Sequence, residues 1–172
     1  MRTVYATLGL VFVLLMLNFG NGVNSDAWFL LNHGRYVASF GFPHVEPFTL
    51  HEGFHFVMQQ WLFAWLLWQI YAHAGSWGLV AFSWAAGAAI LFAYCRLQIL
   101  VSAGNRKLAC LLTGLVGLPV CLLFASQRPQ VASALIFLAE IYLLERYRAR
   151  LTRVLPLAFF ALSALLVNLH AA

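Results

Sequence analysis

The sequence predicts an all-α protein embedded in a membrane, with about five transmembrane helices and further helices lying along the membrane surface. First, 63% of its 172 residues are hydrophobic and only 9% are charged, whereas about 25% of the residues in a soluble domain are charged. Second, the apolar residues gather in runs close to the length that crosses a bilayer. We therefore interpret residues 1–172 as a single transmembrane domain.

Five apolar runs are expected to cross the membrane. They are residues 4–20, 77–95, 108–125, 129–145 and 154–168. The apolar parts of the last two runs are shorter than the ~20 residues that a span usually needs, so each must borrow neighbouring residues. The three cysteines lie in or beside these runs and predict neither a disulfide framework nor a thiolate metal site.

The segment 56–72 is also apolar enough to cross, but its composition favours the membrane surface. It carries Trp61, Trp65 and Trp68 at helical spacing, with glutamines among them. Tryptophans on one helical face suit the headgroup layer. We therefore expect a surface helix here, within a first external loop covering residues 21–75.

The basic residues orient the chain. With a cytoplasmic N-terminus and a flat 56–72 segment, Arg35 and Arg128 alone among the ten Lys and Arg residues lie outside, as the positive-inside rule favours. A six-span chain with its N-terminus outside gives the same distribution. The start of the chain, with Arg2 before an apolar run, is a signal-anchor pattern and favours five spans. A cleaved signal peptide is the other interpretation of this start. The net charge of +5 thus reports orientation, and we expect no nucleic-acid partner.

Residues 51–55 spell H-E-x-x-H, the pattern with which a helix holds zinc. Gly53 between the two histidines and the expected loop-to-helix boundary both argue against a ligand-holding helix. Spacing nominates no third ligand, and no aspartate follows Asp26. A zinc-dependent membrane protease is therefore a minor alternative, with His51 and His55 as weak metal candidates.

The favoured topology gathers most of the remaining ionisable side chains on the external face. Asp26 begins a helix that we expect to run to about Phe40, capped by Ser25 or by Asp26 itself. Glu46 precedes a proline and lies on extended chain. The alternative roles for these two acids are a helix cap and a solvated loop acid.

Arg128 lies beside the expected start of the fourth span, where Pro129 occupies the first helical turn. An arginine at a helix N-terminus makes a site suited to phosphate. The alternative is an arginine that reaches to the lipid headgroups. Glu140, inside a span, is either a hydrogen-bonded bundle residue or a functional group.

Four segments occur in a suggestive order. They are DAWFLLNHGRYVASFGFPHVEPF (26–48), QQWLFAWLL (59–67), RPQVASALIFLAEIYLLERY (128–147) and NLHAA (168–172). This order resembles bacterial multispanning membrane proteins of the GT-C glycosyltransferase superfamily. Their pattern has Asp-x-Trp with a Gly-Arg, then Asp-Pro-Phe, Gln- or Glu-Trp-Leu, Arg-Pro-Gln and Asn-Leu-His. Glu46 stands here in place of the second aspartate.

The resemblance implies a large external loop with membrane-parallel helices, and transfer of a sugar from a polyprenyl-phosphate donor to an external acceptor. Asp26 would be the general base, with Glu46 as the alternate. Arg128 would hold the donor phosphate. Further residues expected to bind substrate are Arg35, Gln130, Asn168 and His170. The expected partners are membrane lipids and the polyprenyl-phosphate-linked sugar, and the need for a divalent metal is left open.

The chain ends at Ala172, whereas GT-C proteins have several hundred residues and more spans. We therefore expect the N-terminal portion of such a protein in a bacterial cytoplasmic membrane, or a short relative that has lost catalysis. A non-enzymatic membrane subunit of a larger complex is the alternative function. A protein partner that completes the bundle is compatible with both.

Overall fold

The computed structural model describes residues 2–19, 22–50, 53–148 and 154–170. Within these ranges the chain is helical, apart from connecting loops and an isolated β-bridge between Val45 and His55. The elements are α1 (Arg2–Phe19), α2 (Ser25–Phe40), α3 (Trp61–Val101), α4 (Arg106–Leu112), the π-helical turn η1 (Thr113–Gly117), α5 (Leu118–Phe124), α6 (Gln130–Tyr147) and α7 (Val154–Leu169). The predicted all-α class is confirmed for the described part of the chain.

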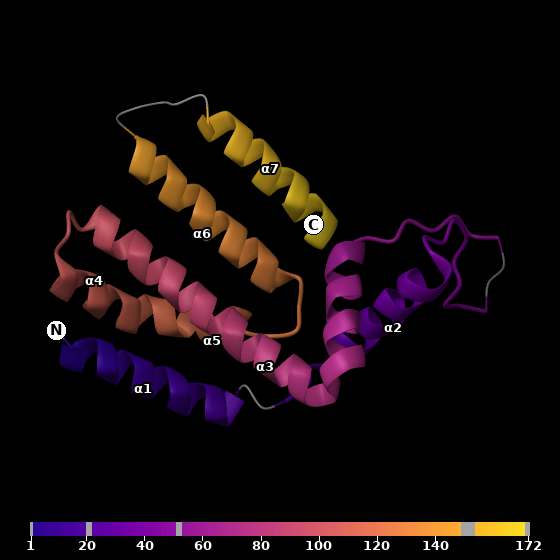
Figure 1. Ribbon diagram of the computed structural model, residues 1–172, viewed down its shortest axis with the longest axis horizontal. Helices are drawn as coiled ribbons and strands as arrows, with labels where there is room; N and C mark the ends of the chain where they lie inside the picture. The colour runs from indigo at the N-terminus through magenta and orange to yellow at the C-terminus, as the bar shows by residue number, and fades with distance from the viewer. Residues whose placement is uncertain (1, 20–21, 51–52, 149–153, 171–172) are drawn as a thin grey trace.

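The helices form a bundle with a side arm (Figure 1). In the bundle, the second part of α3 lies beside α4, α5 and α6, and α1 packs against α4 and α5. Helix α7 packs on the other side of α6, and its end reaches the first part of α3. The side arm consists of α2, the first part of α3 and the loop between them, which lie at an angle to the bundle. The candidate site lies where this arm joins the bundle.

The long helix α3 changes direction at Gly75. This residue has φ 60° and ψ −155°, a conformation essentially restricted to glycine. The bend falls between the expected surface helix and the expected span. The expected start of the surface helix at residue 56 is wrong. Phe56 donates its N–H to the carbonyl of His44, and the left-handed Gln60 delays the helix to Trp61.

Two helical stretches in the described part are long and apolar enough to cross a membrane, Trp61–Val101 and Arg106–Phe124. Only 28% and 33% of the residues in their most apolar windows are buried within the chain. A core helix of a soluble protein would be mostly buried, so these exposed apolar faces favour lipid or protein neighbours. α7 is apolar but shorter, and α6 carries Glu140, Glu145 and Arg146. The count of five spans stays a prediction.

The expected third span is not a uniform α-helix. Its middle turn, η1, is π-helical and ends two residues before Pro119. A proline lacks the N–H that continues an α-helix, and its ring crowds the carbonyl four residues earlier. The wider turn before the proline makes room for that ring.

Close contact between α2 and the first part of α3 depends on Gly34. A Cβ placed at this glycine would overlap the backbone carbonyl group of Ala64. The neighbouring Leu30, Leu31 and Leu67 are buried in the same core. The two helices therefore approach more closely than any other residue type at position 34 would allow.

We expect Gly34→Ala to destabilise the protein by about 1–3 kcal/mol, because the added methyl group overlaps the Ala64 backbone. The measurement is thermal unfolding in detergent, followed by tryptophan fluorescence. Gly9→Ala on α1 is the matched control, since a Cβ there meets nothing within 4 Å. Equal unfolding temperatures for the two variants would contradict this account of the α2–α3 contact.

Candidate functional site

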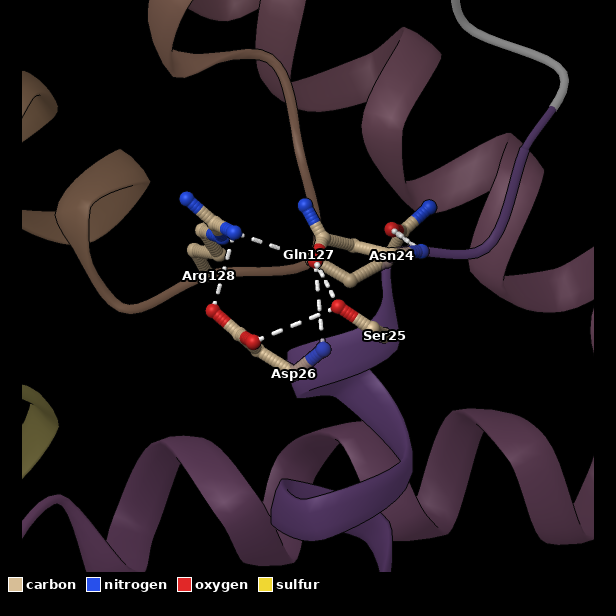
Figure 2. A network of polar contacts seen from close by, with 5 residues as sticks. All are labelled: Asn24, Ser25, Asp26, Gln127 and Arg128. Atoms are coloured by element: carbon tan, nitrogen blue, oxygen red, sulfur yellow. Dashed lines mark hydrogen bonds and ion pairs between the residues drawn. The ribbon is translucent and has the colours of Figure 1, made fainter.

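The candidate site lies where the segment between α1 and α2 meets the segment between α5 and α6. Figure 2 shows Asn24 from the first segment and Ser25 and Asp26, the first residues of α2, beside Gln127 and Arg128 from the second segment. Asn24 and Arg128 are 104 positions apart in the sequence, and their side chains are hydrogen-bonded. The fold thus brings two distant polar segments together at one end of the bundle.

Gln127 is the buried centre of this junction, with a side chain only 1% exposed. Its amide oxygen accepts the N–H of Asn24 at 3.0 Å. Its amide nitrogen donates to Ser83 Oγ at 2.6 Å and to the carbonyl oxygens of Gly22 and Leu79, each at 3.3 Å. One side chain therefore connects α3, the α1–α2 segment and the α5–α6 segment.

Asp26 and Arg128, both predicted site residues, form an ion pair next to this junction. The distance from Arg128 Nη2 to Asp26 Oδ2 is 2.9 Å, and the two side chains are 41% and 57% exposed, in the order Arg128 and Asp26. The same Nη2 donates to Asn24 Oδ1 at 3.2 Å. An ion pair this exposed contributes only about 0–1 kcal/mol to stability. The pair can therefore open at little cost.

The helix cap of α2 differs from the prediction. Neither Ser25 nor Asp26 caps the helix. The cap is Asn24, whose Oδ1 accepts the N–H of Asp26 at 3.1 Å. Because Asn24 takes this role, the carboxylate of Asp26 is left for Arg128, and a negative charge in the first helical turn is itself favourable.

The donors of Arg128 are only partly used. Its Nε atom is buried and has no hydrogen-bond partner in the described part of the chain. A cavity of about 240 Å³ adjoins the junction. It is lined by Gly22, Val23, Asn24, Ser83, Ala125, Ser126 and Gln127. Arg128 and Asp26 do not line this cavity themselves, but both are hydrogen-bonded to its lining residue Asn24. A guanidinium next to a hydrogen-bonding cavity is suited to an anion.

Asn168 and His170, predicted to line the site, fasten the end of α7. Asn168 Oδ1 accepts from Trp61 Nε1 at 2.8 Å, at the start of α3. His170 Nδ1 and Ser133 Oγ lie 2.5 Å apart, and Ser133 follows Arg128 by five residues on α6. The structure thus places the end of α7 near the first turns of α3 and α6.

Gln130 does not join the hydrogen-bond network. It is the first residue of α6, and its side chain is exposed. The residue that sequence reasoning missed is Gln127, in the same polar run. Its signal was a polar side chain directly after the apolar run 108–125, but the sequence alone does not distinguish which of the two glutamines is buried.

Arg35 and Glu46 lie apart from Asp26. Arg35 follows Asp26 by nine residues on α2, about 14 Å of helical rise, and bonds to Asn32 Oδ1 at 3.2 Å. It lines a separate cavity of about 590 Å³ together with Phe48. Glu46 Oε1 accepts the N–H of Phe48 at 2.8 Å and closes a local turn. Within the described part of the chain, neither side chain forms a hydrogen bond or ion pair with Asp26 or Arg128, so the predicted roles of Glu46 as alternate base and of Arg35 in substrate binding stay predictions.

The loop after α2 is held by His33. This histidine is buried, and its Nδ1 lies 2.8 Å from the carbonyl oxygen of Phe29. Its ring packs against those of Phe29 and Phe48, with centroids 3.9 and 4.3 Å away. The ring stack thus holds the turn of Glu46 beside α2.

The described part of the H-E-x-x-H motif is not helical. His51 and Glu52 lie outside the described residues, Gly53 has φ 81° and His55 belongs to the β-bridge. Zinc sites of this type need both histidines on one helical face. Among the described residues, no three His, Cys, Asp or Glu side chains come together as a metal site.

No protein-family model, curated protein or solved structure matches this chain. The functional argument therefore rests on the sequence pattern and on the geometry around Asp26 and Arg128. That geometry combines a carboxylate, a guanidinium and an adjoining cavity at one end of an apolar bundle.

We expect Gln127→Ala to lower the free energy of unfolding by about 2–4 kcal/mol, because it leaves the Asn24 N–H without its acceptor and removes the donor to Ser83 Oγ and to two backbone carbonyls. Gln130→Ala is the matched control and should stay within about 0.5 kcal/mol of the parent. Thermal or denaturant unfolding in detergent measures both. If the two variants unfold alike, Gln127 does not hold the junction.

Proposed function

We propose that this chain is part of a membrane glycosyltransferase that moves a sugar from a polyprenyl-phosphate donor to an external acceptor. The observation that carries the proposal is the contact between Asp26 and Arg128 at 2.9 Å, beside the cavity lined by Asn24 and Gln127. The motif order shared with GT-C proteins points to the same two residues. A general base and a phosphate-binding cation are the groups that this transfer needs.

We infer a topology in which α1, the second part of α3, the α4–α5 stretch, α6 and α7 cross a bacterial cytoplasmic membrane. The N-terminus is then cytoplasmic, and α2 with the first part of α3 lies along the outer surface. Figure 1 supports this arrangement, because the end of α1, the bend of α3, the α5–α6 loop and the end of α7 all lie toward one end of the bundle. The site then lies at the depth of lipid phosphates.

In this proposal, Arg128 binds the donor. A phosphate has two or three acceptor oxygens and competes for the guanidinium that Asp26 holds in the resting state. As the sugar leaves, the bond between its anomeric carbon and the phosphate oxygen breaks. Both bonding electrons stay on the polyprenyl phosphate, whose added charge Arg128 stabilises.

Asp26 activates the acceptor. Once Arg128 has turned to the phosphate, Asp26 Oδ2 is free to accept the proton of the acceptor hydroxyl. The hydroxyl oxygen forms the new bond to the anomeric carbon. Asn168, His170 and Gln130 border this end of the bundle and are assigned to the walls of the donor site. Arg35 lies further along α2 and is assigned to a separate surface.

A second candidate is a non-enzymatic subunit whose bundle is completed by a partner. The observation that favours it is the extent of outward-facing apolar side chains, including Trp77 (81% exposed) and Leu123 (76%). In that case the ion pair of Asp26 and Arg128 only fastens two segments, and its two charges can be exchanged without loss of function.

We expect Asp26→Asn and Arg128→Gln each to lower transfer about 10²–10⁴-fold. The assay measures label transferred from a panel of polyprenyl-phosphate-linked sugars by the chain in native membranes. Glu46→Gln is the matched carboxylate-to-amide control and should keep most activity, because Glu46 lies away from the pair. Full activity of Asp26→Asn would overturn the proposed base.

The double exchange Asp26→Arg with Arg128→Asp separates the two candidates. If the pair is catalytic, the double variant loses sugar-transfer activity as fully as the single variants do, because the carboxylate and the guanidinium have changed places. If the ion pair only holds the two segments together, the double variant regains the parent's unfolding temperature and function. Recovery of function in the exchanged protein would therefore favour the subunit.

A further inference from the structure

A further cavity lies between α3 and α6, toward the other end of the bundle. Its volume is about 530 Å³. It is lined by Phe92, Ala93 and Arg96 from α3 and by Leu138, Ala139 and Tyr142 from α6. Ala93 and Ala139 each add only a methyl group, so a groove remains between larger neighbours. The polar groups of this apolar groove are the guanidinium of Arg96 and the phenol of Tyr142.

The polar groups of the groove lie near the helix ends and the apolar groups lie deeper. Arg96 precedes the last residue of α3, Val101, by five positions, and Tyr142 precedes the last residue of α6 by five. Each is therefore about 7.5 Å of rise from its helix end. Phe92 and Leu138 lie four residues further in, about 6 Å deeper. This order matches the head and chain of a lipid.

Arg96 lacks an acidic partner in the described part of the chain. The ion pairs within 4.0 Å there are Asp26–Arg128 and Glu145–Arg148. Glu140, on the neighbouring helix, does not reach Arg96 within that distance. A guanidinium that faces an apolar groove gains most from an anion that comes with its own apolar surface.

The surroundings favour an anionic lipid over a zwitterionic one. Basic residues outnumber acidic ones at this end of the bundle, where α3 and α6 finish and α4 begins (Figure 1). They are Arg96, Arg106, Lys107, Arg146 and Arg148. Each basic residue near the membrane surface adds attraction for anionic lipids.

We propose that the α3–α6 groove binds an anionic glycerophospholipid, with Arg96 on the phosphate and one acyl chain between Phe92 and Leu138. This site is separate from the Asp26–Arg128 site and lies toward the opposite end of the bundle. It depends on α3 lying in a bilayer and does not depend on the proposed transfer. The positive field at this end selects phosphatidylglycerol over phosphatidylethanolamine.

The test uses the full chain, purified from membranes, stripped of lipid with detergent and offered a mixture of phosphatidylglycerol and phosphatidylethanolamine. Native mass spectrometry counts each bound lipid. We expect Arg96→Gln to lower retained phosphatidylglycerol roughly tenfold, as loss of one charge-assisted contact predicts. Arg148→Gln is the matched control, because it removes the same charge at the same end, whereas Arg148 does not line the groove and is paired with Glu145. It should change retention less than about twofold.

A second variant tests the groove itself. Ala139→Phe fills the space while Arg96 stays in place, and we expect it to lower phosphatidylglycerol retention as much as Arg96→Gln does. If Ala139→Phe does not fold, as judged by circular dichroism, Ala93→Leu takes its place. Equal losses in Arg96→Gln and Arg148→Gln would show a diffuse charge effect and overturn the proposal. Unchanged retention in the filled groove, or a second protein chain bound there instead of lipid, would overturn it too.

Discussion

The position of the candidate site depends on one buried amide. Gln127 is removed from water, so each of its hydrogen-bonding groups must find a partner inside the protein. It finds them on α3 and on the segment that leads into α2. Those bonds hold Asn24 and the start of α2 against the α5–α6 loop. Arg128 is the next residue along that loop, so the bonds of Gln127 also bring Arg128 to Asp26.

Gln127 stabilises the junction, whereas its neighbours Asp26 and Arg128 are the residues proposed to act on a substrate. The buried bonds of Gln127 cost free energy when broken, since they leave unpaired polar groups behind. The exposed pair of Asp26 and Arg128 adds little to stability. A substrate anion can therefore take Arg128 from Asp26 while the framework under both residues stays in place. This separation supports the proposal that the pair acts on a ligand.

The two ends of the bundle also differ in the residues and sites that they carry. One end carries the side arm, the ion pair and the fastened end of α7, and the other carries most of the basic residues and the α3–α6 groove. Gly75 makes this arrangement by turning α3 out of the bundle, and Gly34 lets α2 pack closely on the turned segment. Both features result from the absence of a side chain, at positions where a Cβ would be strained or would overlap its neighbours.

The sequence determined the local features of this protein well. Composition predicted the all-α class, and turn residues placed α2 between Ser25 and about Phe40, because such signals act over a few residues. They placed Pro129 in the first turn of α6, whereas it caps the helix, which begins at Gln130. Asp26 and Arg128 were also selected from the sequence. The distance of Arg35 from Asp26 follows from the predicted helix alone, and the cap at Asn24 is a local difference of one residue. The contact between Asp26 and Arg128 and the burial of Gln127 were not predictable. These depend on how segments about a hundred residues apart meet, and that meeting is set by one glycine bend and one buried amide, which local patterns do not encode.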